Sequence, residues 1–271
     1  FVLEVMGRHA GWIAAAGGLS QAIERAHAYN DWMHDEYLSK SHRFQALGLI
    51  PLQEPAEAVK ELRRIVKELG MCGAMLPSTG IQANLGDQRY WPIYEEAERL
   101  DCMVGVHATV RGPHYFAAEL FDQFIDVHTL SHSFAQMMQM TSIIMRGVME
   151  RFPRLRVAFM EAGCSWVPYW MGRMDEEWEK RGAVEAPLCK KRPSEYVRSG
   201  RVYLHAEDYE PLVGATAALL TPEVLYYASD WPHWDNEFPE NIDHLSHRED
   251  LSPEAKKWLL AGTARKLYGL Q

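Results

Sequence analysis

Short apolar runs alternate with amphipathic stretches along most of this chain, and this alternation limits the folds that it can adopt. The run 44–52 is followed by a stretch in which Ala58, Leu62 and Ile65 share one helical face, and Gly70 follows as a stop signal. A strand-length apolar run followed by an amphipathic helix is one βα unit, and successive βα units build a parallel sheet. The sequence therefore predicts an α/β protein.

Six strands and five helices are expected from this pattern. The strands are expected at 44–52, 72–76, 102–106, 156–160, 201–206 and 224–230, and the helices at 55–69, 91–100, 134–152, 167–180 and 253–267. A length of 271 residues suits one (β/α) barrel, but a complete barrel has eight strands. We therefore expect a TIM-barrel-like fold that lacks its first βα units. Its first and last strands would have open edges unless the N-terminal segment or another chain covered them, which favours a homo-oligomer.

Three of the apolar runs end in a side chain that can bind a metal or carry a proton. They lead into His107, Glu161 and Asp230, and Pro232 stops the last run. The carboxyl ends of barrel strands form the face at which α/β-barrel enzymes keep their chemistry. Histidine and carboxylate side chains are metal ligands and general acids or bases. Each of the three also has a structural interpretation, as a strand-end histidine, a loop cap and a turn aspartate.

Other side chains near the expected strand ends are candidates for contact with a substrate. His132 lies four residues after His128, which would place both on one helical face, although the residues between them do not establish a helix. His205 lies at the end of the run 201–206, and Trp231 follows Asp230 directly. We expect His132, His205 and Trp231 to line a substrate pocket; the alternatives are a metal-binding His128–His132 pair and a Trp231 that only covers the rim.

The composition excludes several classes of protein. The formal net charge is −9 and no basic stripe is present, so nucleic acid is not expected as a partner. No apolar stretch approaches the roughly 20 residues of a membrane span, and no signal peptide is evident. The four cysteines are too scattered for a zinc knuckle and too few for a disulfide framework. We expect a cytoplasmic protein that acts on a small-molecule substrate, without a membrane or nucleic-acid partner.

Several longer motifs occur in one order along the chain. They include Tyr29-Asn30-Asp31-Trp32, Gly105-Val106-His107, Phe159-Met160-Glu161-Ala162-Gly163-Cys164 and Ala228-Ser229-Asp230-Trp231-Pro232-His233. Through them residues 21–271 resemble the second amidohydrolase family, the branch that includes aminocarboxymuconate-semialdehyde decarboxylase and related metal-dependent hydrolases and decarboxylases of barrel fold. The resemblance implies a divalent metal cofactor, with zinc expected and manganese as the alternative.

The resemblance also implies roles for the three strand-end residues. His107 matches the metal-binding histidine of the fifth barrel strand, and Asp230 matches the eighth-strand aspartate that binds the metal and takes part in proton transfer. Glu161 occupies a sixth-strand position where many relatives have histidine, and we expect it to act in catalysis or to join the metal ligands. A carboxylate there would stabilise a developing anion less well than an imidazolium, which counts against decarboxylation.

The chain departs from the family's pattern at its start. The His-x-His pair that supplies two metal ligands does not occur before Tyr29. Residues 1–20 instead resemble the sugar-phosphate-binding segment of phosphofructokinases, through Met6-Gly7-Arg8, but no phosphate-binding glycine loop accompanies them. We expect an unrelated segment at 1–20 and a barrel domain at 21–271, as in a fused or truncated chain.

Two classes of function follow from these expectations. The first is a metal-dependent hydrolase or decarboxylase that acts on a small carboxylated or cyclic substrate, with Asp230 and Glu161 as catalytic residues. The second is an inactive barrel fragment that serves as a scaffold or self-associates, because two expected metal ligands are absent. Metal binding distinguishes the two.

Overall fold

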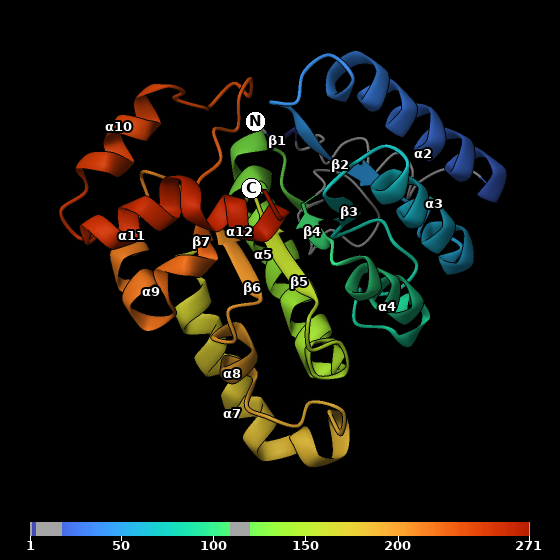
Figure 1. Ribbon diagram of the computed structural model, residues 1–271. Coiled ribbons are helices and arrows are strands. Elements are labelled where there is room, and N and C mark those ends of the chain that lie inside the picture. The colour runs from blue at the N-terminus through green and yellow to red at the C-terminus, as the bar shows by residue number, and fades with distance from the viewer. Residues whose placement is uncertain (1, 4–17, 109–119, 271) are drawn as a thin grey trace.

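A parallel sheet forms the centre of the computed structural model, which describes residues 2–3, 18–108 and 120–270 (Figure 1). Its seven strands are adjacent in chain order and every neighbouring pair is parallel. The strands are β1 Val2–Leu3, β2 Gln45–Leu49, β3 Gly73–Pro77, β4 Met103–His107, β5 Arg156–Met160, β6 Val202–His205 and β7 Leu225–Tyr226. The predicted α/β, barrel-like class is confirmed.

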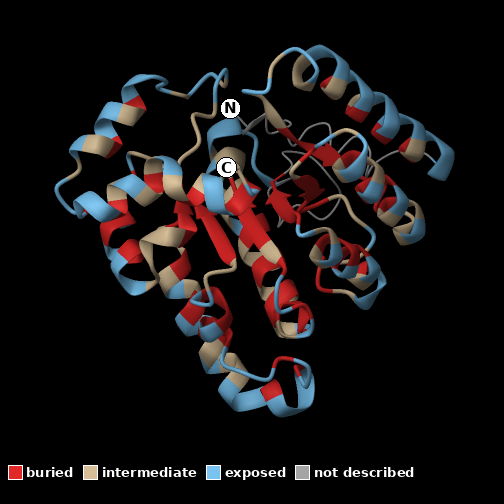
Figure 2. Cartoon of the chain, in the orientation of Figure 1, coloured by how far each residue is buried: buried red, intermediate tan, exposed pale blue. Residues whose placement is uncertain are grey.

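Helices connect the strands and pack on the sheet. They are α2 Leu19–Met33, α3 Pro55–Lys67, α4 Trp91–Leu100, α5 Phe124–Met145, α6 Val148–Arg151, α7 Val167–Glu185, α8 Pro193–Val197, α9 Val213–Leu219, α10 Glu240–His247, α11 Pro253–Lys257 and α12 Thr263–Tyr268, with π-helical turns η1 His34–Leu38 and η5 Trp258–Gly262 and 3-10 turns η2 Gln88–Tyr90 and η4 Pro222–Val224. Their buried faces and the strands form one core (Figure 2).

The helix α3 shows how the sequence sets the limits of these elements. Pro55 occupies its first turn, and the Glu54 side chain accepts a hydrogen bond from the backbone N–H of Ala56 as an N-cap. The predicted face, with Leu62 and Ile65, is fully buried. Gly70 follows at a φ of 69°, which a glycine adopts without strain. The helix therefore begins and ends at the predicted signals.

The register of the central strands places their polar ends at one level. Pro77 of β3 pairs with His107 of β4, and His107 pairs with Met160 of β5. Glu161 is the next residue after Met160, so it lies beside His107 across the strand pair. The parallel register therefore accounts for the proximity of these two residues, which the sequence predicted from strand ends alone.

The N-terminal edge of the sheet is covered by a strand that the sequence did not predict. β1 pairs with β2 through Val2 opposite Gln45 and Leu3 opposite Ala46. The count of six strands was thus too low, and the open edge expected near residue 44 is closed by the N-terminal segment. The homo-oligomer inferred from open edges stays a prediction with less support.

The last strand is shorter than predicted. The run 224–230 was expected to be a strand, but β7 covers only Leu225–Tyr226, and Val224 belongs to η4. The backbone N–H of Tyr227 donates to the carbonyl of Leu259 in η5, at 2.9 Å, instead of continuing a ladder. Asp230 therefore lies in a loop, four residues after the end of β7. The strand ends early because the backbone of Tyr227 is hydrogen-bonded to η5 and not to a neighbouring strand.

Two predicted helices also have different limits. The helix expected at 134–152 begins ten residues earlier, at Phe124, and is divided by Gly147, whose φ is 78° and where a Cβ atom would lie 2.6 Å from that of Leu188. The closing helix expected at 253–267 is α11, η5 and α12 in succession. Within the described ranges, no helix is long and apolar enough to span a membrane.

Candidate active site

His107 and Glu161 are joined at the ends of β4 and β5. The Nε2 atom of His107 contacts Oε2 of Glu161, and its Nδ1 atom contacts the carbonyl of Ala108. Both ring nitrogens therefore lie next to oxygen atoms that can accept a hydrogen bond. An Nδ1–H bond to a backbone carbonyl is also what orients the Nε2 atom of metal-binding histidines. The pair therefore lies where a metal or substrate could replace one contact.

A second imidazole contacts the same carboxylate. The Nε2 atom of His132, on α5, lies 3.4 Å from Oε1 of Glu161. Burial by itself would raise the pKa of Glu161, but the charges and hydrogen bonds of His107 and His132 outweigh it and hold that pKa well below its usual range. Glu161 is therefore a carboxylate whose negative charge is offset by two imidazoles.

Asp230 and His233 complete a group of potential metal ligands with Glu161. One ligand atom from each of the three lies within 4.8 Å of the others. The Oδ2 atom of Asp230 is 3.6 Å from Nδ1 of His233. Two carboxylate oxygens and one imidazole nitrogen form a donor set that a divalent ion accepts, so the residues fit a metal. His107 does not belong to this group of three and reaches it through Glu161.

Both carboxylates of this group sit on unusual backbone. Glu161 has a φ of 51° and Asp230 a φ of 53°, and Asp101 is the one other non-glycine residue of the described ranges with a positive value. Left-handed backbone is unfavourable for residues with a side chain, and it concentrates at functional sites. The strain therefore coincides with the two residues that the sequence predicted to act in catalysis.

The surroundings of Asp230 favour its protonated form. Burial raises the pKa of Asp230 to about 6, and the negative charges of Glu161 and Glu207 act in the same direction, while His233 and His205 oppose them. These contributions also locate Glu207 and His205 near the site. Asp230 is thus a group that can hold a proton close to neutral pH.

His205 is buried beneath this group and pairs with Glu207. Its Nδ1 atom lies 3.1 Å from Oε1 of Glu207, and its ring lies 5.8 Å from the ring of Tyr226. Burial by itself would raise the pKa of Glu207, but the charge and hydrogen bond of His205 lower it. A side chain that is 2% exposed is better placed to hold Glu207 than to meet a substrate directly. The substrate-binding role predicted for His205 remains a prediction.

Aromatic rings extend the site outward from His132. The ring of His128 lies 5.2 Å from that of His132, it is stacked on Phe124 at 5.0 Å, and it lies 6.1 Å from Trp234. We call Phe124, His128 and Trp234 the aromatic wall. Trp231 and Trp234 are both exposed, at 67% and 74%, and the substrate contact predicted for Trp231 remains a prediction. The ring of Trp234 lies near those of Phe124 and His128.

Gln136 of α5 holds the two strand ends on which the site is built. Its Nε2 atom donates to the carbonyl of Val106 at 2.7 Å and to that of Met160 at 2.8 Å. These residues immediately precede His107 and Glu161. The side chain is fully buried, so it satisfies backbone acceptors that have no access to water.

Sequence reasoning missed His233, Phe124 and Gln136. His233 carried one signal, its place three residues after Asp230 in a Pro-containing turn. Phe124 lies in the first turn of α5, before the predicted start of that helix, and Gln136 lies inside the predicted helix without a pattern that marks it. Their position near the candidate site depends on tertiary structure and not on a local sequence pattern.

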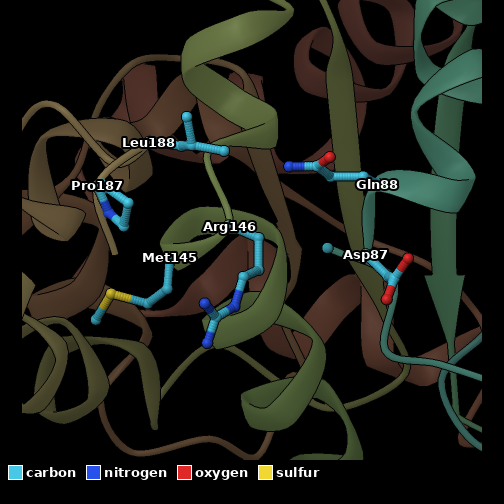
Figure 3. Close-up of a pocket in the computed structure, with 7 residues that line it drawn as sticks. Asp87, Gln88, Met145, Arg146, Pro187 and Leu188 are labelled. Carbon is cyan, nitrogen blue, oxygen red and sulfur yellow. The ribbon is translucent and has the colours of Figure 1, made fainter. Parts of the chain in front are cut away.

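Two further features lie outside this site. The group Asp208, Glu237 and His244 also has ligand atoms close together, but a hydrogen bond of 2.7 Å from His244 to Asp208 raises the pKa of His244 and accounts for the arrangement as an ion pair. A surface pocket of about 550 Å³ contains none of the site residues (Figure 3). It is lined by Gly86, Asp87, Gln88, Met145, Arg146, Pro187 and Leu188.

Comparisons with known proteins identify relatives over almost the whole chain. The 2-amino-3-carboxymuconate-6-semialdehyde decarboxylase of Dictyostelium discoideum is 28% identical over 255 residues, which cover 92% of this chain and 67% of the relative. The gamma-resorcylate decarboxylase of a Polaromonas species is 24% identical, over 95% of this chain and 80% of the relative.

Solved structures share the fold. A 5-carboxyvanillate decarboxylase from Novosphingobium aromaticivorans, with bound manganese, has a TM-score of 0.84 at 20% identity and covers 99% of this chain and 76% of its own. A dihydroxybenzoic acid decarboxylase from Polaromonas, also with bound manganese, has a TM-score of 0.77 at 22% identity, over 96% and 80%.

A protein-family comparison settles the membership. The family described as Amidohydrolase matches residues 4–270, so the match begins inside the segment 1–20. The resemblance of that segment to phosphofructokinases finds no support, and residues 4–17 lie outside the described ranges. The chain belongs to the amidohydrolase family.

Proposed function

We propose that this chain is a metal-dependent decarboxylase of a small, planar carboxylic acid. The observation that carries the proposal is the group of Glu161, Asp230 and His233, with His107 and His132 against Glu161, at the carboxyl ends of the strands. Two relatives and two structural neighbours are themselves named decarboxylases of carboxylated compounds, and this favours decarboxylation over hydrolysis. No observation supports the inactive scaffold.

Glu161, Asp230 and His233 would hold the divalent ion, with His107 as a further ligand after release of its contact with Glu161. A bound ion supplies positive charge that orients a substrate carboxylate or an adjacent oxygen. A donor set that combines carboxylate and imidazole accepts manganese, and manganese is the ion named in both structural neighbours. We therefore favour manganese and keep zinc as the alternative.

The two imidazoles beside Glu161 answer the objection that a carboxylate at this position opposes decarboxylation. An isolated carboxylate would repel negative charge that develops on the substrate. Here Glu161 is not isolated, because Nε2 of His132 lies 3.4 Å from its Oε1 atom and His107 contacts Oε2 when it does not bind the ion. Through these contacts Glu161 orients the two imidazoles.

Decarboxylation breaks the bond between the carboxylate carbon and its neighbour, and leaves the electron pair on that neighbour. Carbon dioxide departs, and the neighbouring carbon must receive a proton. Asp230, His132 and His233 are the site groups that can hold a proton and deliver it. We assign the transfer to Asp230, because its carboxylate lies 3.6 Å from the imidazole of His233 and has an oxygen within 4.8 Å of a Glu161 oxygen.

The aromatic wall supports a planar substrate. Phe124 is 56% exposed and Trp234 is 74% exposed, although both rings contact His128. Exposed aromatic faces beside a polar site can stack on a flat ring or a conjugated chain. This placement favours an aromatic or conjugated acid over a saturated one.

The proposal is tested by assaying the purified protein with manganese against a panel of hydroxybenzoic and conjugated dicarboxylic acids, with release of carbon dioxide as the readout. Asp230→Asn should abolish turnover, and Glu161→Gln should reduce the rate while metal binding is partly kept. Asp31→Asn, which alters an exposed partner of Arg64, should leave the rate unchanged. Turnover that survives Asp230→Asn, or hydrolysis of lactones or amides without loss of carbon dioxide, would exclude the proposed reaction.

A further inference from the structure

Glu210 is a buried carboxylate in the loop between β6 and α9. Its side chain accepts hydrogen bonds from three backbone N–H groups in two separate loops. Oε1 accepts from Cys164 at 2.8 Å and from Ser165 at 2.9 Å, and Oε2 accepts from Glu207 at 3.1 Å. The residue is 7% exposed, so these bonds lie in a region of low water access. Charge-assisted bonds of this kind are stronger than bonds between neutral groups.

The loop after β5 is shaped around this carboxylate. Glu161 and Gly163 have positive φ values of 51° and 64°, which turn the following N–H groups toward one point. Successive N–H groups in such a conformation form a concave anion-binding site. A Cβ atom at Gly163 would lie 2.2 Å from Oε1 of Glu210, so only glycine allows the approach. In this protein the anion bound by these N–H groups is the side-chain carboxylate of Glu210.

The two loops that Glu210 joins both carry candidate site residues. Glu161 lies three residues before Cys164, and Glu207 lies three residues before Glu210 itself. The left-handed conformation of Glu161 is unfavourable by itself and persists only where surrounding contacts determine it. Among the described residues, the hydrogen bonds to Glu210 are the contacts that hold the chain just after Glu161 to another loop.

A second interaction keeps the Glu210 loop in place from the outside. The Arg248 guanidinium donates to the carbonyl of Asp208 at 2.7 Å and to the Asp250 carboxylate at 2.8 Å. These bonds hold Asp208, two residues before Glu210, to the segment that precedes α11.

We propose that Glu210 is a positioning residue for Glu161, a candidate metal ligand of this site. It fixes Glu161 and Glu207 relative to each other by holding their loops around one buried carboxylate. The inference rests on the proposed metal-dependent function, because its consequence is a metal affinity. Glu210 itself contacts neither the candidate ligand atoms nor a substrate.

The variant Glu210→Gln tests this role with little change in volume. The amide keeps one oxygen that accepts hydrogen bonds. Its –NH₂ group replaces the other oxygen and faces a backbone N–H that had donated to the carboxylate, so that hydrogen bond is lost. Calorimetric titration with Mn²⁺ should show affinity at least about 10-fold weaker than in the unchanged protein. Hydrogen exchange should become faster in 161–166 and 205–210 together. Glu210→Asp, which keeps the charge on a shorter side chain, should recover part of the affinity.

The matched control is Glu96→Gln, a change of another buried carboxylate that pairs with Arg63 and Arg99 away from the site. It should lower thermal stability and leave Mn²⁺ affinity and exchange of the two loops unchanged. If Glu210→Gln binds Mn²⁺ as tightly as the unchanged protein, Glu210 is not a positioning residue, while the proposed function stands. If the unchanged protein binds no Mn²⁺, the proposed function fails and this inference fails with it. Should Glu210→Gln not fold, Glu210→Asp gives the same comparison.

Discussion

The imidazole of His107 bridges the carbonyl of Ala108 and the carboxylate of Glu161, so the end of one strand is tied to the loop that follows the next. A metal that binds Nε2 of His107 must take the place of its contact with Glu161, and a metal held by Glu161 alone binds beside it. Replacing His107 therefore distinguishes two roles by the change in metal affinity. The affinity falls if His107 is a ligand, and it rises if His107 competes with the metal for Glu161.

We expect His107→Ala to weaken Mn²⁺ binding by about 10- to 100-fold, the range for loss of a ligand or of a group that orients one. Calorimetric titration measures it. His247→Ala, which removes a surface histidine of α10, is the control and should change nothing. Tighter binding in His107→Ala would mean that His107 competes with the metal and would remove it from the ligand set.

His233→Ala should weaken Mn²⁺ binding to a similar extent, because it removes the one nitrogen donor in the group of three. The same titration and the same His247→Ala control apply. Metal affinity that does not change in His233→Ala would restrict the site to Glu161, Asp230 and His107, as the sequence predicted.

Gln136→Leu should lower the free energy of unfolding by about 2 kcal/mol or more, because the carbonyls of Val106 and Met160 lose their buried donor. Urea unfolding gives the value. An exposed glutamine, changed in Gln82→Leu, should stay within about 0.5 kcal/mol of the unchanged protein. Equal stability of both variants would show that Gln136 is not needed to satisfy the strand ends.

Glu96 makes a prediction about pH. Hydrogen bonds from Arg99 and Arg63 lower the pKa of Glu96 from 4.5 to about 2, against burial, which acts the other way. Since the folded state favours the carboxylate, its stabilisation is complete above pH 4.5 and is lost as the pH falls from there toward 2. Glu96→Gln should cost about 1–2 kcal/mol at pH 7 and progressively less below pH 4.5. A difference in unfolding free energy that is constant from pH 7 to pH 3 would contradict this.

Trp234→Ala should raise KM for a planar substrate by about 5- to 10-fold with a smaller change in kcat, because a stacking contact serves the bound and reacting substrate alike. Steady-state kinetics on the best substrate of the panel measures both constants. Trp231→Ala is the comparison, since Trp231 is a tryptophan of the same loop that does not belong to the aromatic wall, and it should have little effect. The reverse order would restore Trp231 as the pocket residue that the sequence predicted.

The parts of the site that were predictable lie on regular structure. β5 and α4 have the predicted limits, and β4 differs by one residue at each end, because each is a clear apolar run or amphipathic stretch. His107 and Glu161 lie side by side because β4 and β5 pair in parallel with His107 opposite Met160. Asp230 was expected at the end of a strand, but that strand ends at Tyr226 and Asp230 comes near Glu161 from the loop that follows.

The parts that were missed depend on contacts between distant segments. β1 is two residues long and pairs with a strand more than 40 positions away, which no local pattern indicates. The start of α5 was hidden because Phe124, His128 and His132 do not form the apolar face of an ordinary surface helix. Glu210 is an acidic loop residue by sequence, and its burial arises only when two loops meet around it.

The helix α5 carries Phe124, His128, His132 and Gln136 at intervals of four residues, and they pass from an exposed ring to a fully buried amide. At 1.5 Å per residue this series spans about 18 Å along one rod. The inner end of this series holds the carbonyls that precede His107 and Glu161, and the outer end presents an exposed ring. One helix thus joins the surface of the molecule to the two strand ends on which the candidate site is built.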